Sequence, residues 1–327
     1  MLNEIRPSRH KLIQTSLLLQ DINELLDRDF DDISSCPACK SSKRKNKFKK
    51  YDLNFVQCDI CSTIYMNPRP SKKSMDIYYK TSRNYKYWAE NIFPSSANAR
   101  TEMICKPSLK RIEQTLENCI EFKKCDVLEI GPGFGLFAEL CDKEKAFRSM
   151  EVLEPTPPLA THCKEIGLKV NETDIESFEK KNAFNLIFAF EVIEHIYDPY
   201  FFLRKTKDFL TEKGFLVISC PNGIGFDTKM LGPFSPSVDN EHVNLFSPKG
   251  IEYILERSGF KLISLQTPGK MDVEIVSNFF DESPGFFKHE NNFKKLLEEN
   301  KNSKENLQYK ISKEKLSGHM WAFAQKL

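Results

Sequence analysis

The stretch Asp126–Leu136, with the sequence DVLEIGPGFGL, decides the fold. It opens with a short, nearly continuous apolar run, Asp126–Ile130, and three glycines follow at alternate positions. Such a run is typical of a strand in a parallel sheet that helices cover on both faces. Glycines let the chain turn sharply at the end of the strand and let a ligand touch the backbone. We therefore expect a nucleotide-like ligand at this turn.

The alternation of apolar strand, turn and amphipathic helix continues through the rest of the chain. Asp198 before Pro199 and Ser247 before Pro248 are typical of helix N-caps followed by a proline in the first turn. The pattern predicts an open, doubly wound α/β sheet. Its further strands are expected at Ser149–Glu154, Leu168–Val170, Phe184–Phe190, Phe215–Ser219, Lys261–Thr267 and His319–Ala324.

The spacing of the glycines distinguishes between cofactors. A dinucleotide site normally has G-x-G-x-x-G, whereas this turn reads E-x-G-x-G-x-G and begins with Glu129. A carboxylate beside a pyrophosphate costs Coulomb energy, whereas S-adenosylmethionine has no phosphate and carries a sulfonium and an ammonium. Glu154, 19 residues after Gly135, is near the offset at which an acid reaches a ribose diol. The acids favour S-adenosylmethionine over a nicotinamide cofactor.

From about Cys105 to Leu327 the chain resembles the class I S-adenosylmethionine-dependent methyltransferases, in the branch with ubiquinone-type and sugar methyltransferases. The matching motifs occur in the family's order: Val127–Gly135 (VLEIGPGFG), Glu154, Asp174–Glu176, Phe190–His195 (FEVIEH), Gly214–Asn222 (GFLVISCPN) and Glu241–Pro248 (EHVNLFSP). Asn185 departs from the family, which often has Asp there. The resemblance implies a Rossmann-like, mostly parallel sheet of seven strands.

The resemblance also implies how the cofactor is held. The glycines Gly131, Gly133 and Gly135 would contact its methionine and adenosyl portions, and Glu129 would lie near its ammonium group. Glu154 would bind the ribose hydroxyls, Asp174 would bind the adenine amino group, and Glu191 would lie at the cofactor's edge.

Methyl transfer is an in-line displacement, so the protein must align a nucleophile and, where needed, remove its proton. His195 follows the strand Phe184–Phe190 and His242 follows the next strand, so both are expected near the methyl group. Histidine titrates near neutrality and suits a proton acceptor. Glu194 beside His195 completes the catalytic candidates, although this pair could simply cap its loop. His10, His162, His289 and His319 lack such a context.

Two C-x-x-C pairs, Cys36-Pro-Ala-Cys39 and Cys58-Asp-Ile-Cys61, are separated by 18 residues, which fits a zinc template. Four thiolates close a tetrahedron with no open position, so we expect a structural zinc ion. A thioredoxin-like redox pair is the alternative, and the presence of two pairs disfavours it. The remaining cysteines are expected to be ordinary thiols: Cys105, Cys119, Cys125, Cys141, Cys163 and Cys220.

The sequence divides into four parts. We expect an N-terminal helical segment at 1–30, a zinc ribbon at 31–70, a helical linker at 71–104 and the methyltransferase domain at 105–327, with a charged helical insertion at 282–315. The stretch Ile64–Tyr79 resembles the segment after the zinc ribbon of bacterial methyltransferases in surface-glycan pathways. That resemblance implies a small-molecule acceptor, a nucleotide- or lipid-linked sugar. The segment Asn222–Asn240 is expected to be an irregular part of the acceptor pocket.

Composition limits the partners. The chain has 327 residues, 40% hydrophobic and 29% charged, with a net charge of +2, which suits a globular protein of about two domains. No apolar run is long enough to span a membrane, and no signal peptide is evident, so a cytoplasmic location is expected. Seven basic residues within 40–50 could touch phosphates, which leaves a nucleic-acid-binding protein or RNA methyltransferase as the alternative. The neutral balance of charge favours a solvated ribbon tip.

Overall fold

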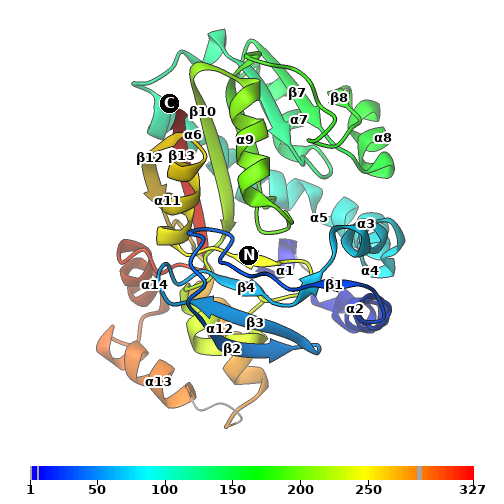
Figure 1. The fold of residues 1–327 in the computed structure, drawn as a ribbon. Helices are drawn as coiled ribbons and strands as arrows, with labels where there is room; N and C mark the ends of the chain where they lie inside the picture. Colours follow the sequence, from blue (N-terminus) through cyan, green and yellow to red (C-terminus); the bar gives the residue numbers. More distant parts are fainter. Residues whose placement is uncertain (1, 6, 286–288) are drawn as a thin grey trace.

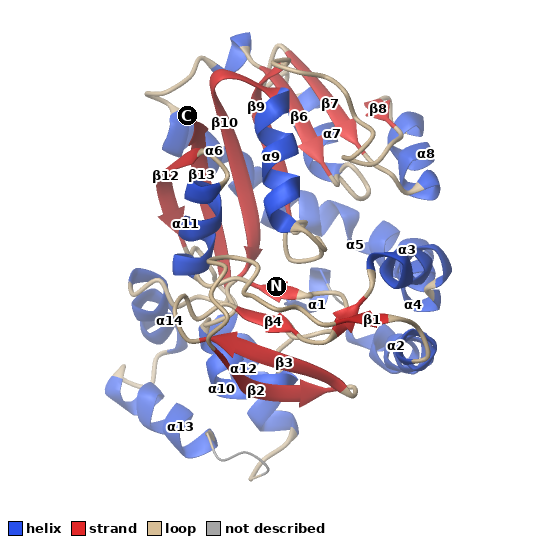
Figure 2. Cartoon of the chain, in the orientation of Figure 1, coloured by secondary structure: helices blue, strands red, loops and turns tan. Residues whose placement is uncertain are grey.

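Seven apolar segments form one mixed sheet at the centre of the computed structural model, which describes residues 2–5, 7–285 and 289–327 (Figures 1 and 2). The strand order is β12-β13-β10-β9-β6-β7-β8. All neighbours pair in parallel except β13, which is antiparallel to both β10 and β12. The strands are β6 (Asp126–Ile130), β7 (Ser149–Leu153), β8 (Lys169–Asn171), β9 (Phe184–Phe190), β10 (Leu210–Pro221), β12 (Phe260–Gln266) and β13 (His319–Lys326).

Helices cover both faces of this sheet because its central strands are apolar on both sides. On β9, Leu186 and Phe188 pack in one buried cluster, while Ile187 and Ala189 pack in another on the opposite face. Successive side chains of a strand point to opposite faces, so a strand buried on both sides must be apolar throughout. The first face is covered by α6 (Lys106–Leu116) and α7 (Leu136–Lys143), the second by α9 (Pro199–Phe209) and α11 (Pro248–Arg257). A further helix, α8 (Pro157–Glu165), packs beside β8. The expected doubly wound seven-stranded fold is confirmed.

The two expected helix starts are also confirmed. The Asp198 side chain accepts hydrogen bonds from the backbone N–H groups of Tyr200 and Phe201 at the start of α9. The Ser247 hydroxyl accepts one from Gly250 N–H, 2.9 Å away, at the start of α11. These bonds satisfy donors that a helix leaves unpaired in its first turn.

A second, smaller sheet carries the paired cysteines. The strands β2 (Arg44–Lys50), β3 (Leu53–Cys58) and β4 (Ile64–Met66) are antiparallel, and β11 (Asn244–Leu245) adds a fourth strand beside β4. Two short strands, β1 (Phe30–Asp31) and β5 (Arg69–Pro70), pair with each other. The sequence did not predict that a segment of the large domain would complete this sheet.

The N-terminal helices lie beside the small sheet, at the edge of the large sheet to which its parallel strands point (Figure 2). They are α1 (Leu2–Ile5), α2 (Lys11–Leu26), α3 (Lys72–Thr81), α4 (Arg83–Tyr87) and α5 (Phe93–Arg100), with π-helical turns at Trp88–Ile92 and Thr101–Cys105. The buried Asp21 side chain ties α2 to the junction of α3 and α4, because it accepts hydrogen bonds from Ser82 and from the backbone of Arg83 and Asn84.

The C-terminal helices form a separate buried cluster. They are α10 (Phe226–Leu231), α12 (Asp272–Glu282), α13 (Glu290–Glu299) and α14 (Lys304–Lys313). Within the segment 282–315 the structure has the helices α13 and α14, and residues 286–288 lie outside the described part of the chain. None of the described helices is long and apolar enough to cross a membrane.

Candidate functional site

The glycine turn follows β6, and its three glycines have different surroundings. All three have positive φ, +67° at Gly131, +57° at Gly133 and +71° at Gly135. A Cβ at Gly131 would lie 2.8 Å from Val192 Cγ2, and one at Gly135 would lie 2.7 Å from Leu168 Cδ1. A Cβ at Gly133 would meet nothing within 4 Å. The first and third glycines therefore allow close packing, and the second leaves open space beside the backbone for a ligand.

Two buried carboxylates flank this turn. Glu129 is 3% exposed, and its Oε2 has no hydrogen-bond partner among the described residues. Burial raises the pKa of Glu129 to about 8. Glu154, 4% exposed, accepts a hydrogen bond from Thr156 N–H at 2.9 Å, and burial raises its pKa. An unpartnered buried acid beside open backbone fits a ligand that brings a positive charge, as S-adenosylmethionine does.

Burial of Glu129 makes stability depend on pH. The unfolded carboxyl has its ordinary pKa of 4.5, so between pH 4.5 and 8 the folded protein keeps a proton that the unfolded chain has lost. Folding is therefore penalised increasingly as pH rises through this window. We expect Glu129→Gln to raise the free energy of unfolding, without cofactor, by up to about 4 kcal/mol at pH 8 and to leave it nearly unchanged near pH 4.5. Urea denaturation at both pH values measures this.

Glu151 on the neighbouring strand β7 is the matched control. It is also buried, which raises its pKa, but Lys169 at 2.7 Å and Lys180 at 2.5 Å lower it below the ordinary value overall. Glu151→Gln should therefore lose stability at pH 8, the opposite sign. A loss of stability at pH 8 in both variants would contradict the assignment of an uncompensated acid at Glu129.

The other two expected cofactor acids lie at the ends of β8 and β9. Asp174 is exposed, and a hydrogen bond from Ser177 at 2.8 Å lowers its pKa. Glu191 has a positive φ of 53° and accepts a hydrogen bond from the Ser219 hydroxyl at 2.8 Å. Burial raises its pKa, but His319, whose Nε2 lies 2.6 Å from Glu191 Oε1, lowers it to about 2 overall. Glu191 is therefore a fixed negative charge at this edge.

The expected catalytic histidines are brought together. The ring centroids of His195 and His242 are 4.8 Å apart. His242 Nδ1 lies 2.8 Å from the carbonyl oxygen of Ser237. A carbonyl only accepts hydrogen bonds, so the proton is on Nδ1 and Nε2 is free to accept one. Burial lowers the pKa of His195 to about 4, which keeps its ring neutral at physiological pH.

Glu194 lies beneath the histidines. It is 0% exposed, and neither carboxylate oxygen has a hydrogen-bond partner among the described residues. Burial and the nearby charge of Glu191 raise its pKa well above the ordinary value. Its Oε1 is 4.0 Å from His195 Nε2. One donor atom from each of Glu194, His195 and His242 lies within 4.8 Å of the others, a spacing that could also hold a divalent cation.

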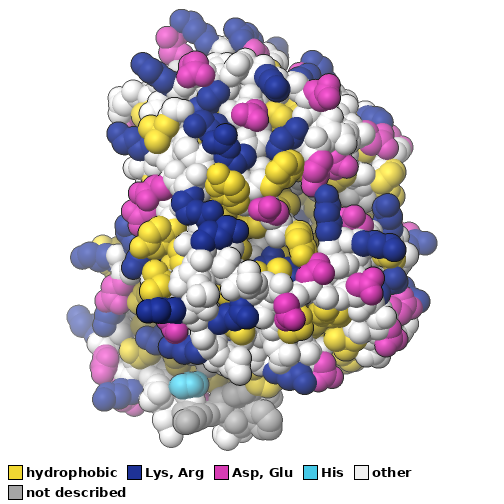
Figure 3. All heavy atoms as spheres, viewed as in Figure 1, with side chains coloured by type: hydrophobic (Ala, Val, Ile, Leu, Met, Phe, Trp, Pro, Cys, Tyr) yellow, Lys and Arg dark blue, Asp and Glu magenta, His cyan; other side chains and the backbone are white. Residues whose placement is uncertain are grey.

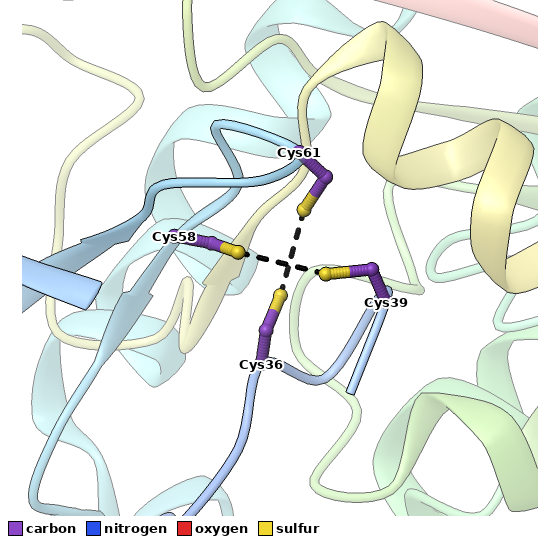
Figure 4. A group of neighbouring side chains, drawn as sticks. All are labelled: Cys36, Cys39, Cys58 and Cys61. Carbon is purple, nitrogen blue, oxygen red and sulfur yellow. Dashed lines mark hydrogen bonds between the residues drawn. The ribbon is translucent and has the colours of Figure 1, made fainter. Parts of the chain in front are cut away.

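The four paired cysteines point their sulfurs at one centre (Figure 4). The Cys36 and Cys61 sulfurs are 3.6 Å apart, and those of Cys39 and Cys58 are 3.5 Å apart. A tetrahedral ion with Zn–S bonds of about 2.3 Å would separate its sulfurs by about 3.8 Å, so the donor set fits zinc. The residue directly after each C-x-x-C pair, Lys40 or Ser62, has a φ of 64°, which is typical of a tight turn.

Sequence reasoning missed two side chains that contact this site. The sequence around His319 gives no sign of a role, yet the antiparallel pairing of β13 with β10 brings it to Glu191. Tyr79 on α3 has its hydroxyl 3.1 Å from His195 Nδ1, and its neighbour Tyr78 donates a hydrogen bond to Glu241 at 3.1 Å. No local motif marks these residues, because their partners lie more than 100 positions away in the chain.

The segment 222–240 differs from the expectation of an irregular loop. It contains the helix α10, whose Phe226, Met230 and Leu231 are buried against α12. The glycines and prolines of this segment lie outside the short helix. They favoured the expectation of a loop, although the apolar residues between them have helical spacing.

Comparisons with known proteins agree with this geometry. A family model described as a methyltransferase domain matches residues 96–265, just over half of the chain. A ubiquinone biosynthesis O-methyltransferase of Rickettsia prowazekii is 26% identical over 160 residues, 46% of this chain and 60% of that protein. One from Azorhizobium caulinodans is 29% identical over 167 residues, 48% of this chain and 59% of that protein. The chain therefore spans about three fifths of these two relatives.

A solved structure agrees in fold. One chain of the complex between the Haloferax volcanii Trm112 methyltransferase activator and a putative methyltransferase has a TM-score of 0.50 at 11% identity, over 73% of this chain and 95% of that chain. Similarity at this level of identity supports the fold alone. Together with the family match and the sheet order, it leads to one conclusion: the chain belongs to the class I S-adenosylmethionine-dependent methyltransferases, with S-adenosylmethionine as its methyl donor.

Proposed function

We propose that this methyltransferase methylates a hydroxyl group of a small molecule, a nucleotide- or lipid-linked sugar in glycan biosynthesis, and that its histidine pair removes the hydroxyl proton. The observation that carries the proposal is the fixed orientation of His242. Its Nδ1 is bound to the Ser237 carbonyl, so Nε2 is left as a basic nitrogen beside the neutral ring of His195. General bases of this kind contribute about 10²–10⁴-fold to a rate.

S-adenosylmethionine supplies an electrophilic methyl group on a sulfonium. We assign the backbone of Gly131, Gly133 and Gly135 to its methionine and adenosyl portions and Glu129 to its ammonium. The orphaned Oε2 of Glu129 and the open space at Gly133 support this assignment. The remaining acids take the ribose hydroxyls, the adenine amino group and the cofactor's edge: Glu154, Asp174 and Glu191, respectively.

We assign the supporting roles around the base to Tyr79 and Glu194. The Tyr79 hydroxyl fixes the His195 ring through Nδ1. Burial and the charge of Glu191 raise the pKa of Glu194, which favours the uncharged form of its carboxyl group beside His195. The four cysteines Cys36, Cys39, Cys58 and Cys61 hold a structural zinc ion, which their sulfur spacing supports.

A phenolic hydroxyl is the second candidate acceptor. The relatives from Rickettsia prowazekii and Azorhizobium caulinodans are ubiquinone biosynthesis O-methyltransferases, and the same base could serve a phenol. A nucleic-acid substrate receives less support. Basic side chains on the face in Figure 3 are intermixed with acidic ones, and two lysines of the ribbon pair with acids, Lys45 with Asp59 and Lys49 with Asp52.

The test is incubation of the purified protein with methyl-labelled S-adenosylmethionine and a panel of nucleotide sugars, polyprenyl-linked sugars and catechols. We expect labelled sugar as the product. We expect His242→Asn to lower the rate about 100-fold and to leave the cofactor dissociation constant within about twofold. His10→Asn, in the N-terminal segment, is the matched control and should keep the rate. Label only in catechols would contradict the sugar assignment, and an unchanged rate in His242→Asn would contradict the base.

A further inference from the structure

The small sheet holds the loop that carries His195. This loop, residues 191–198, joins β9 to α9. The Tyr197 hydroxyl donates a hydrogen bond to Asp31 Oδ2 at 2.7 Å, and Arg69 Nη1 donates one to the Tyr197 carbonyl at 3.1 Å. The Arg69 guanidinium also lies over the Tyr197 ring, 5.6 Å from its centroid. Both strands of the β1–β5 pair therefore contact the residue two positions after His195.

The same module holds the loop that carries His242. Residues Asn244 and Leu245, directly after Val243, form the strand β11 that pairs with β4. Met66 N–H donates to the Val243 carbonyl at 3.0 Å, and Lys50 Nζ donates to the Val238 carbonyl at 2.5 Å. The loop is thus fixed to the ribbon on both sides of His242.

Asn244 then joins the two loops to each other. Its backbone N–H donates to the Glu194 carbonyl at 3.0 Å, and its side-chain amide donates to the Ile196 carbonyl at 2.8 Å. The carbonyls on either side of His195 are therefore held by a residue whose own strand is part of the small sheet. The separation of the two histidine rings depends on that sheet.

Arg69 is the buried cation among these contacts. It is 1% exposed, and its Nε and Nη2 have no hydrogen-bond partner among the described residues. A buried cation is costly unless a negative charge lies near it. Burial lowers the pKa of Arg69 to about 10, and the nearby Tyr197, Tyr65 and Asp198 act against that shift. The guanidinium is held by Tyr197, whose carbonyl accepts its hydrogen bond and whose ring lies beside it.

We propose that residues 31–70 are a positioning module for the reaction, in which Asp31 and Arg69 hold the loop of His195 and the strand β4 holds the loop of His242. Arg69 is almost fully buried and acts through the loop of His195, so it is a positioning residue and not a catalytic one. The proposal rests on the proposed function only for the role of the histidines. The contacts themselves belong to the chain whatever the acceptor is.

Hydrogen exchange followed by mass spectrometry tests the proposal without an acceptor. In Arg69→Met we expect exchange at least about tenfold faster within 191–198 and 240–247, because the carbonyl of Tyr197 loses its donor and the loops separate. Exchange within the strand β7, 149–153, should be unchanged, as should the zinc content per chain. Arg69→Lys, which keeps one donor and the charge, should restore most of the protection.

Lys47→Met is the matched control, because Lys47 is an exposed ribbon cation on β2 whose ammonium donates a hydrogen bond to Gln57 at 3.2 Å. It should change none of these measurements. Unchanged exchange in both histidine loops of Arg69→Met would overturn the proposal, and so would faster exchange spread evenly over the chain. Should Arg69→Met fail to fold, Tyr197→Phe removes only the bond to Asp31, and it must still speed exchange within 191–198.

An acceptor found in the panel gives a second measurement. Arg69→Met should lower kcat at least about tenfold, a larger effect than on the KM for S-adenosylmethionine, because both histidines lie on the released loops and most of the assigned cofactor residues lie outside them. A rise in that KM with unchanged kcat would overturn the positioning role. A chain that methylates no sugar but shows the local exchange pattern would keep the positioning module and lose the acceptor assignment.

Discussion

Cys36→Ser is expected to lower the free energy of unfolding of the whole chain by at least about 5 kcal/mol, since structural zinc sites contribute roughly 10–16 kcal/mol to folding. The effect should not stay within the ribbon. Cys36 and Cys61 are buried in the same cluster as Ile187 on β9 and Phe202 on α9. The two C-x-x-C turns also form hydrogen bonds with the large domain. Arg257 donates to the Ala38 carbonyl at 2.7 Å, and the Ser247 hydroxyl donates to the Cys61 carbonyl. Disorder of the C-x-x-C turns would therefore expose the buried cluster between the main sheet and its helices.

Urea denaturation with zinc content per chain measures this effect, and Cys125→Ser is the matched control. Cys125 is also buried but belongs to the cluster on the opposite face of the main sheet, and its thiol donates to the Glu121 carbonyl at 3.4 Å. A serine hydroxyl can keep that bond, so we expect a loss of about 1 kcal/mol. Equal losses in the two variants would mean that Cys36 acts as an ordinary buried thiol and holds no metal.

The fold could be predicted because its signals are local. The expected Phe184–Phe190 strand matches β9, and the expected Ser149–Glu154 strand matches β7 to within one residue. The strand β10 is longer than expected, Leu210–Pro221 in place of Phe215–Ser219. Its first part contains Glu212, Lys213 and Gly214, which interrupt the apolar run, and the pairing with β9 shifts register there. The polar residues at the start of β10 do not prevent this part of the strand from pairing with β9, because they lie at the end of the sheet.

The site could be predicted only where its residues follow a strand directly. Glu129, Glu154 and Glu191 each lie at or just after a strand, so parallel strand ends bring them to one edge. His319 reaches the same edge from an antiparallel strand inserted between β10 and β12, and Arg69 and Tyr79 reach it from the N-terminal segments. Their positions depend on how segments far apart in the chain pack together, and the hydrophobic pattern of the sequence does not predict this packing.

The sequence also could not predict which glycine of the turn leaves room for the cofactor. The three glycines are equivalent in the sequence, but only Gly133 has open space where a side chain would begin. We expect Gly133→Arg to raise the dissociation constant of S-adenosylmethionine at least about 1000-fold, or about 4 kcal/mol, because the new side chain would occupy that space and place a cation where a cation must bind. Isothermal titration measures it.

The fold of this variant should survive, because its Cβ meets no atom and a positive φ costs a non-glycine residue only about 1–2 kcal/mol. Gly167→Arg separates the two effects. Gly167 also has a positive φ, +89°, and also has nothing within 4 Å of its Cβ, but it lies between α8 and β8 and not in the turn. It should therefore show the same small loss of stability with full cofactor affinity. Full affinity in Gly133→Arg as well would mean that the open space beside the turn is not where the methyl donor binds.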